Sequence, residues 1–122
     1  MSKIHYHQFL EKLIEMTNNH EINWKPIPND ETTIMELTGD SYERVCYWRS
    51  FYFEHQNANI VVYSVRAAQG IPTVRVSSLL KDPNFQPIEF DRNEFGSACS
   101  KLQFSILDIF PTPEDIIESF PD

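Results

Sequence analysis

An apolar stripe is the first regular feature of the chain. Within residues 3–18, apolar positions recur at the three- and four-residue spacing of one helix face. The stripe consists of Tyr6, Phe9, Leu10, Leu13, Ile14 and Thr17. Glu11 and Glu15 fall on the other side, so the pattern predicts an amphipathic helix that packs on another element.

The next segment has no long periodic pattern. Two prolines favour an extended connector over residues 21–30, with Trp24 as its apolar anchor. Residues 32–37 form a short run with β-branched side chains, which predicts a strand. The Gly-Asp-Ser sequence at 39–41 then predicts a turn.

Three strands are predicted in the middle of the chain. Residues 44–55 and 58–68 are dense in aromatic and branched side chains, and the Gln-Asn pair between them suits a two-residue hairpin. A turn near Gly70 leads into a third strand over residues 73–80. These segments predict an antiparallel meander.

The first hairpin decides which side chains share a sheet face. A turn at the Gln-Asn pair places Phe53 opposite Ile60, and a turn near Gly70 extends the alternation into the third strand. One face is then apolar at one end and basic at the other, with Phe51, Phe53, Ile60 and Val62 followed by Arg49, Ser64, Arg66, Thr73, Arg75 and Ser77. The opposite face is the predicted core surface, formed by Cys46, Trp48, Tyr52, Val61, Tyr63, Val65, Val74 and Val76. A slip of one residue in the register would exchange the two faces.

Two helix starts are predicted in the C-terminal third. Asp91 and Glu94 have the spacing of a capping box, and Phe90 and Phe95 stand where a hydrophobic staple forms. The stripe that follows comprises Phe95, Cys99, Leu102, Ile106 and Ile109. The second start lies at Pro113, followed by acids in the first turn and by an apolar side of Ile116, Ile117 and Phe120.

These elements predict an α+β fold with an N-terminal helix, an antiparallel meander sheet of three to five strands and two C-terminal helices packed on one sheet face. The predicted core face would lie beneath the N-terminal helix and the helix over residues 95–109. The 122 residues suit a single domain spanning 1–122, and a hydrophobic content of 41% permits a packed core.

The composition and the N-terminal sequence indicate where in the cell the protein is expected. No apolar run approaches the ~18–20 residues that cross a bilayer, and the N-terminus lacks the apolar segment of a signal peptide. Cys46 and Cys99 are too few for a disulfide scaffold. We therefore expect a cytoplasmic protein that does not bind membranes.

The net charge of −8 is unevenly distributed along the chain. Acids dominate residues 1–43 and 82–122, whereas residues 44–81 contain Glu54 among five basic side chains. The acidic total argues against nucleic-acid binding, which depends on basic surface. The basic segment coincides with the predicted sheet, so its arginines are the first candidates for a site.

The polar end of the mixed face is the candidate ligand site. Arginines separated by hydroxyl groups suit a phosphate or carboxylate ligand, and this set comprises Arg49, Arg66, Arg75, Ser64, Thr73 and Ser77. The simpler explanation is that the arginines pair with the chain's own surplus carboxylates. The apolar end, with Phe51, Phe53, Ile60 and Val62, is a candidate dimer surface with the arginines at its rim. Alternatively, one helix covers each face.

Motifs for metal binding or catalysis are absent from the sequence. His5 and His7 would lie about 200° apart on a helix, and no zinc, calcium or Gly-rich phosphate motif occurs. Cys46 and Cys99 fall on predicted core positions, where a thiol acts as a small hydrophobic group. We therefore expect no metal, no cofactor and no catalytic site.

The layout resembles that of small uncharacterised proteins of Gram-positive bacteria and their phages. The resemblance lies in the opening helix, the turn into Ile22-Asn23-Trp24, the meander and the acidic C-terminal helices. It implies a cytoplasmic accessory protein and carries no catalytic residues.

Three functions follow as hypotheses. The first is a non-enzymatic interaction module that binds another protein or itself, as a homodimer, through the mixed face. The second is a domain, with or without enzymatic activity, that binds a small anionic molecule at the arginines. The third is an acidic decoy for a basic partner, which requires both acidic segments to share one surface.

Overall fold

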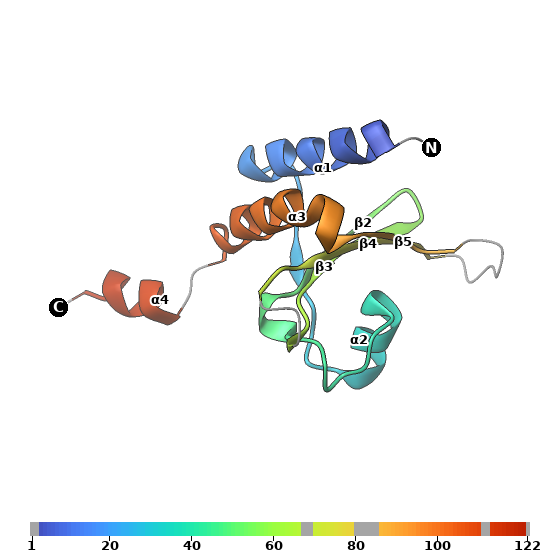
Figure 1. The fold of residues 1–122 in the computed structure, drawn as a ribbon. Helices are drawn as coiled ribbons and strands as arrows, with labels where there is room; N and C mark the ends of the chain where they lie inside the picture. The colour runs from blue at the N-terminus through green and yellow to red at the C-terminus, as the bar shows by residue number, and fades with distance from the viewer. Residues whose placement is uncertain (1–2, 67–69, 80–85, 111–112, 122) are drawn as a thin grey trace.

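The computed structural model describes residues 3–66, 70–79, 86–110 and 113–121 and has an α+β fold (Figure 1). In chain order its elements are α1 (Lys3–Asn18), β1 (Lys25–Pro26), α2 (Glu31–Thr38), the 3-10 turn η1 (Tyr47–Arg49), β2 (Phe51–His55), β3 (Ala58–Tyr63), β4 (Thr73–Ser78), β5 (Ile88–Phe90), α3 (Arg92–Leu107) and α4 (Pro113–Ser119). The five strands pair antiparallel in sequence order. The predicted N-terminal helix and antiparallel meander are therefore confirmed.

Helices lie on both sides of the sheet (Figure 1). On one side α1 and α3 pack over a core of Leu10, Leu13, Ile22, Trp24, Phe51, Ile60, Val62, Val74, Phe90, Phe95, Cys99, Leu102 and Ile106. On the other side α2 covers a smaller core of Ile27, Ile34, Leu37, Val45, Val61 and Tyr63. One helix layer covers each face, which was the alternative to an open apolar face.

The first hairpin has the predicted register. Phe53 pairs with Ile60, and Phe51 pairs with Val62. Gln56 and Asn57 both adopt positive φ, at 48° and 63°, as a two-residue turn that follows the strand twist requires. The local turn therefore fixes the pairing of β2 and β3.

The prediction of a strand over residues 32–37 is wrong, because this segment is α2. The Asp30 carboxylate accepts a hydrogen bond of 2.9 Å from the Thr33 backbone N–H, and so caps the helix N-terminus. Gly39 ends the helix in the left-handed conformation and donates its N–H to the Met35 carbonyl. These two caps outweigh the weak strand preference of the β-branched residues between them.

The predicted strand over residues 44–55 is interrupted by η1. Val45 still pairs with Val65, but one 3-10 turn intervenes before β2 begins. Ser50 holds this turn, since its hydroxyl donates to the Cys46 carbonyl at 2.8 Å. The turn carries Trp48 out of the predicted core, leaving 55% of its surface exposed.

The predicted face of the third strand is also wrong. Val74 pairs with Val62 and Arg75 pairs with Val61, whereas the expected turn pairs even-numbered with odd-numbered residues. The side chains of β4 therefore point to the opposite faces from those predicted. β3 ends at Tyr63 and β4 begins at Thr73, so the connection between them is longer than the two-residue turn expected. Arg75 consequently lies on the α2 side of the sheet, together with Thr73 and Ser77.

Both faces of the β2–β3 hairpin are buried: the predicted mixed face lies in the larger core, and Val61 and Tyr63 of the predicted core face lie in the smaller one. The proposed dimer surface lies in the core under α1 and α3, where Phe51, Ile60 and Val62 are at most 5% exposed and Phe53 packs beside them. These residues do not form one open apolar surface in the single chain, because α1 and α3 pack over the face that they form.

The start of α3 agrees with the prediction. The Asp91 side chain accepts a hydrogen bond of 2.9 Å from the Asn93 N–H, and Phe90 and Phe95 contact each other edge to face. The predicted stripe is buried at Phe95, Cys99, Leu102 and Ile106.

The second C-terminal helix differs from the expectation that it packs on the sheet. Figure 1 shows α4 apart from the rest of the molecule, and its apolar side chains are exposed. No helix in the described part of the chain is long and apolar enough to cross a membrane.

Candidate functional site: an apolar groove beside the C-terminal helix

The structure does not bring the three candidate arginines together. Arg49 lies at the end of η1, Arg66 is exposed beyond β3, and Arg75 lies on the opposite side of the sheet from the first core. The three arginines therefore do not share one sheet face, because the register of β4 and the η1 turn differ from the prediction.

Arg49 takes part in a polar network at the junction of η1, β3 and α3. Gln103 of α3 donates hydrogen bonds to the Arg49 carbonyl at 2.9 Å and to the Ser64 hydroxyl at 2.7 Å. The Arg49 guanidinium donates in return to the Gln103 side-chain oxygen at 3.4 Å. Ser64 is thus committed to the protein interior, and the network fixes Arg49 at the end of the sheet.

Arg75 is paired inside the protein, which is the simpler explanation offered by the sequence. Its guanidinium lies 2.9 Å from the Glu89 carboxylate and donates to the Thr38 carbonyl at 3.1 Å. Glu89 comes from the acidic C-terminal segment and also accepts from the Tyr63 hydroxyl at 3.3 Å. Arg75 therefore links the sheet to the end of α2.

Tyr63 in this cluster should make the stability of the protein depend on pH. Burial and, to a lesser degree, the Glu89 charge raise the pKa of Tyr63 to about 12 from its usual 10.0. Between pH 10.0 and about 12, the Tyr63 hydroxyl is therefore protonated more often in the folded chain than in the unfolded chain. The free energy of unfolding will fall as the pH rises through that window, by at most about 1.4 kcal/mol per pH unit from this group.

Urea unfolding followed across this pH range, compared between the protein and Tyr63→Phe, isolates the contribution of Tyr63. The substitution removes the hydroxyl and keeps the ring, so the two stability curves are expected to converge as the pH rises. Curves that stay parallel throughout would show that Tyr63 ionises equally in both states.

An open groove lies at the other end of the sheet, between η1, the β1 segment and the C-terminal end of α3. It has a volume of about 670 Å³ and is lined by Pro26, Ile27, Asn29, Tyr47, Trp48, Arg49, Phe51, Leu107, Phe110 and Pro113. We call it the η1 groove. Phe51 and Phe110 form its apolar floor by stacking with ring centroids 5.0 Å apart.

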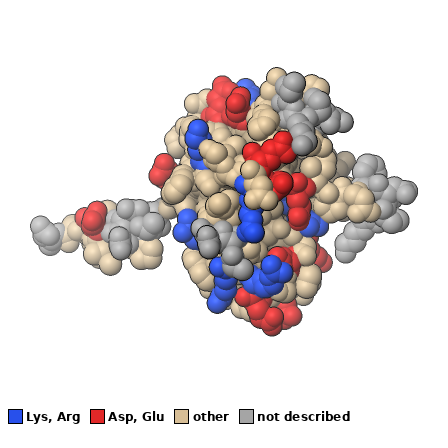
Figure 2. Space-filling model, in the orientation of Figure 1, with Lys and Arg blue, Asp and Glu red and all other residues tan. Residues whose placement is uncertain are grey.

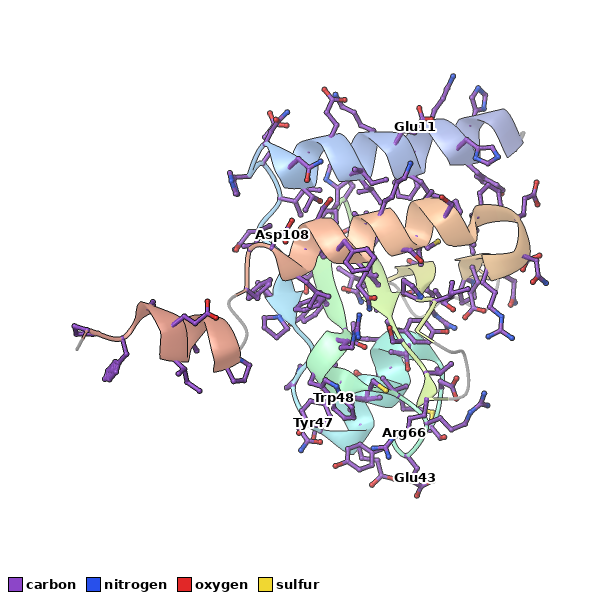
Figure 3. All side chains as sticks on the ribbon, turned by 60° about the vertical axis from the view of Figure 1, so that its left-hand side comes forward. Glu11, Glu43, Tyr47, Trp48, Arg66 and Asp108 are labelled. Carbon is purple, nitrogen blue, oxygen red and sulfur yellow. The ribbon has the colours of Figure 1, made fainter. Side chains whose placement is uncertain are left out.

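The rim of the η1 groove is aromatic and basic. Trp48 meets Tyr47 edge to face at 5.3 Å, and the Arg66 guanidinium carbon lies 5.6 Å from the centroid of the Trp48 ring. Figure 3 shows these three side chains near one another, on the side of the molecule away from α1. An exposed tryptophan at the edge of an apolar groove is typical of a protein-binding surface.

The helix α4 begins at this groove, because Pro113 is one of its lining residues. Ile116 and Ile117 of α4, and Phe120 directly after its end, are 55%, 73% and 71% exposed. We call these three residues the α4 face. The sequence of α4 adds three acids and no base. Figure 2 shows an acidic group on α4, and both acidic and basic groups on the main body.

The thiols and histidines form no second site among the described residues. Burial raises the pKa of the fully buried Cys99 thiol to about 11, which keeps it protonated at neutral pH. No group of three or more histidine, cysteine or carboxylate side chains within those residues is placed to hold a metal ion.

Comparison with known proteins adds nothing to this picture. No protein-family model, curated protein or solved structure matches the chain. The resemblance to small proteins of Gram-positive bacteria and their phages stays a prediction, and the function is inferred from the site alone.

The η1 groove was missed at the sequence level. Its lining comes from three segments far apart in the chain, represented by Pro26, Trp48 and Phe110. The available signal was the α4 face, an apolar side on a short acidic helix after two closely spaced prolines. Such a helix is too short to be stable in water without packing, which points to a binding partner.

Proposed function

We propose that this protein is a cytoplasmic, non-enzymatic protein-interaction module, and that the η1 groove receives an acidic amphipathic helix. The observation that carries the proposal is the rim of the groove, where Trp48 is 55% exposed over an apolar floor. Burying exposed aromatic surface supplies most of the binding free energy at such sites.

The charges at the groove select the kind of helix. Arg49 lines the groove and Arg66 lies over Trp48 at its rim, and none of the described residues that line the groove is a carboxylate. A helix with acids beside its apolar side would place negative charge next to these guanidinium groups. A basic helix would meet like charges there. This arrangement supports an acidic helix as the ligand.

The proposal predicts that a peptide will protect Trp48 from solvent. The receptor is the full chain with Ile117→Gln and Phe120→Gln, and the ligand is a peptide of residues 108–122. We expect acrylamide quenching of the tryptophan fluorescence to fall with added peptide and to saturate. Trp24 is 4% exposed, so it contributes a constant, weakly quenched background.

Two controls make this measurement specific. The same peptide with both glutamine substitutions should leave the quenching unchanged, because it lacks the apolar side that enters the groove. A receptor that also carries Trp48→Phe should lose the response while still binding peptide. Quenching that is unchanged at saturating peptide in the Trp48 receptor contradicts the proposed function.

A further inference from the structure

The helix α4 itself has the chemistry that the η1 groove would select. It is seven residues long, and its α4 face is exposed although isolated helices of this length are marginal in water. Its sequence also contains three acids and no base. The protein therefore presents a ligand helix and a receptor groove on one chain.

The path of the chain leads α4 out of its own groove. Pro113 at the start of the helix already lines the groove, and the residues after it run away from the main body (Figure 1). About 10 Å of helix, at 1.5 Å per residue, separates Pro113 from Phe120. The α4 face is thus presented to another molecule.

We propose that two copies of this chain form a symmetric dimer in which each α4 docks into the η1 groove of the other. This inference rests on the proposed function, because it names the partner of the same groove. The donor helix and the acceptor groove lie next to each other on the chain. One two-fold rotation can therefore place each helix in the groove of the other copy, which gives a closed dimer. Each groove is completed only by the partner copy.

Local charge favours this pairing over general self-association. Two chains of net charge −8 repel each other at a distance. The reciprocal arrangement places the acidic α4 of each copy beside Arg49 and Arg66 of the other, where opposite charges meet. Copies that meet through other acidic surfaces gain no such contact.

Light scattering coupled to size-exclusion chromatography tests the dimer over about a hundred-fold range of chain concentration. The full chain should pass from monomer to dimer mass. Ile117→Gln with Phe120→Gln should raise the dissociation constant by about a hundred-fold or more, because both docked helices lose their apolar anchors. Trp48→Glu, which changes the groove instead of the helix, should raise the dissociation constant by a similar factor.

A matched control is Phe104→Gln. Phe104 is a 64% exposed aromatic residue of α3 that does not line the groove, so its loss should leave the dimer unchanged. Mixing the α4 variant with Trp48→Glu should restore a weaker dimer, since one intact helix then meets one intact groove. Homotypic contact between two α4 helices predicts instead that Trp48→Glu dimerises normally, which would overturn the inference.

The outcomes separate the two proposals. A chain that stays monomeric, with Trp48 better protected than in the α4 variant, would mean that α4 folds back onto its own groove. That result overturns the dimer and leaves the groove as a receptor for an acidic helix. A monomeric chain whose Trp48 also fails to respond to the peptide overturns both.

Discussion

Trp24→Ala is expected to lower the free energy of unfolding by about 3–5 kcal/mol, the range for removing a large buried aromatic side chain. Trp24 is 4% exposed, and its ring meets Phe53 edge to face with centroids 4.7 Å apart. The indole N–H donates to the Thr17 hydroxyl at 2.9 Å, and that hydroxyl donates to the Leu13 carbonyl. The substitution therefore leaves a cavity between α1 and the sheet and removes the donor from which the Thr17 hydroxyl accepts.

Urea unfolding followed by circular dichroism measures this loss, and Trp48→Ala is the matched control. It makes the same chemical change at a position that is 55% exposed, so dilute protein should lose less than about 1 kcal/mol. Trp24→Phe, which keeps an apolar ring without the donor, should fall between the two. Equal losses at the two tryptophans would show that burial of Trp24 does not anchor the connector.

The elements that were predictable from the sequence carry their signals locally. The apolar stripes of α1 and α3 specify both helices, and the cap at Asp91 specifies where α3 begins. A two-residue turn leaves one register for β2 and β3, so every pair in that hairpin followed from the position of the turn. Trp24 is buried as expected of an anchor.

The errors lie where the outcome depends on distant contacts. The pairing of β4 with β3 has the opposite parity to the expected one, which places Arg75 on the other face, and nothing in the local sequence indicated that parity. The η1 turn is held by Ser50, which also accepts a hydrogen bond from the Ser64 N–H across the sheet. Only the assembled sheet brings these two serines together.

The candidate site shows the same limit. Pro26, Trp48 and Phe110 are unremarkable in their own segments and form a groove only after β1, η1 and α3 have packed. The ligand helix, in contrast, is visible in the sequence, since Ile116, Ile117 and Phe120 give the predicted helix an apolar side. Sequence patterns predict an amphipathic helix well, but they do not predict the concave surface into which it docks.

Gly39→Ala is expected to lower the free energy of unfolding by about 2–4 kcal/mol, for two separable reasons. Gly39 has a φ of 70°, so a β-carbon strains the backbone. That carbon would also overlap the Arg75 guanidinium, with Cζ only 2.7 Å away. Arg75 cannot retreat without loosening its contacts with the Thr38 carbonyl and Glu89.

Gly70→Ala separates these two costs. Gly70 has a similar φ of 86°, but an added β-carbon meets no atom of the described residues within 4 Å, so backbone strain alone applies and the expected loss is about 1 kcal/mol. Both variants are compared by urea unfolding at one pH. Equal losses at the two glycines would mean that Arg75 yields at no cost and does not hold the end of α2.

A double-mutant cycle with Arg75→Ala gives the sharper measurement, because it removes the group that the new β-carbon would strike. In that background Gly39→Ala should cost only about the 1 kcal/mol of backbone strain. The difference from its cost in the intact protein is the coupling between Gly39 and Arg75. A coupling near zero would show that the close approach of the guanidinium to the α2 cap has no energetic consequence, whereas a coupling of about 1–3 kcal/mol would identify Arg75 as the side chain that locks α2 onto the sheet.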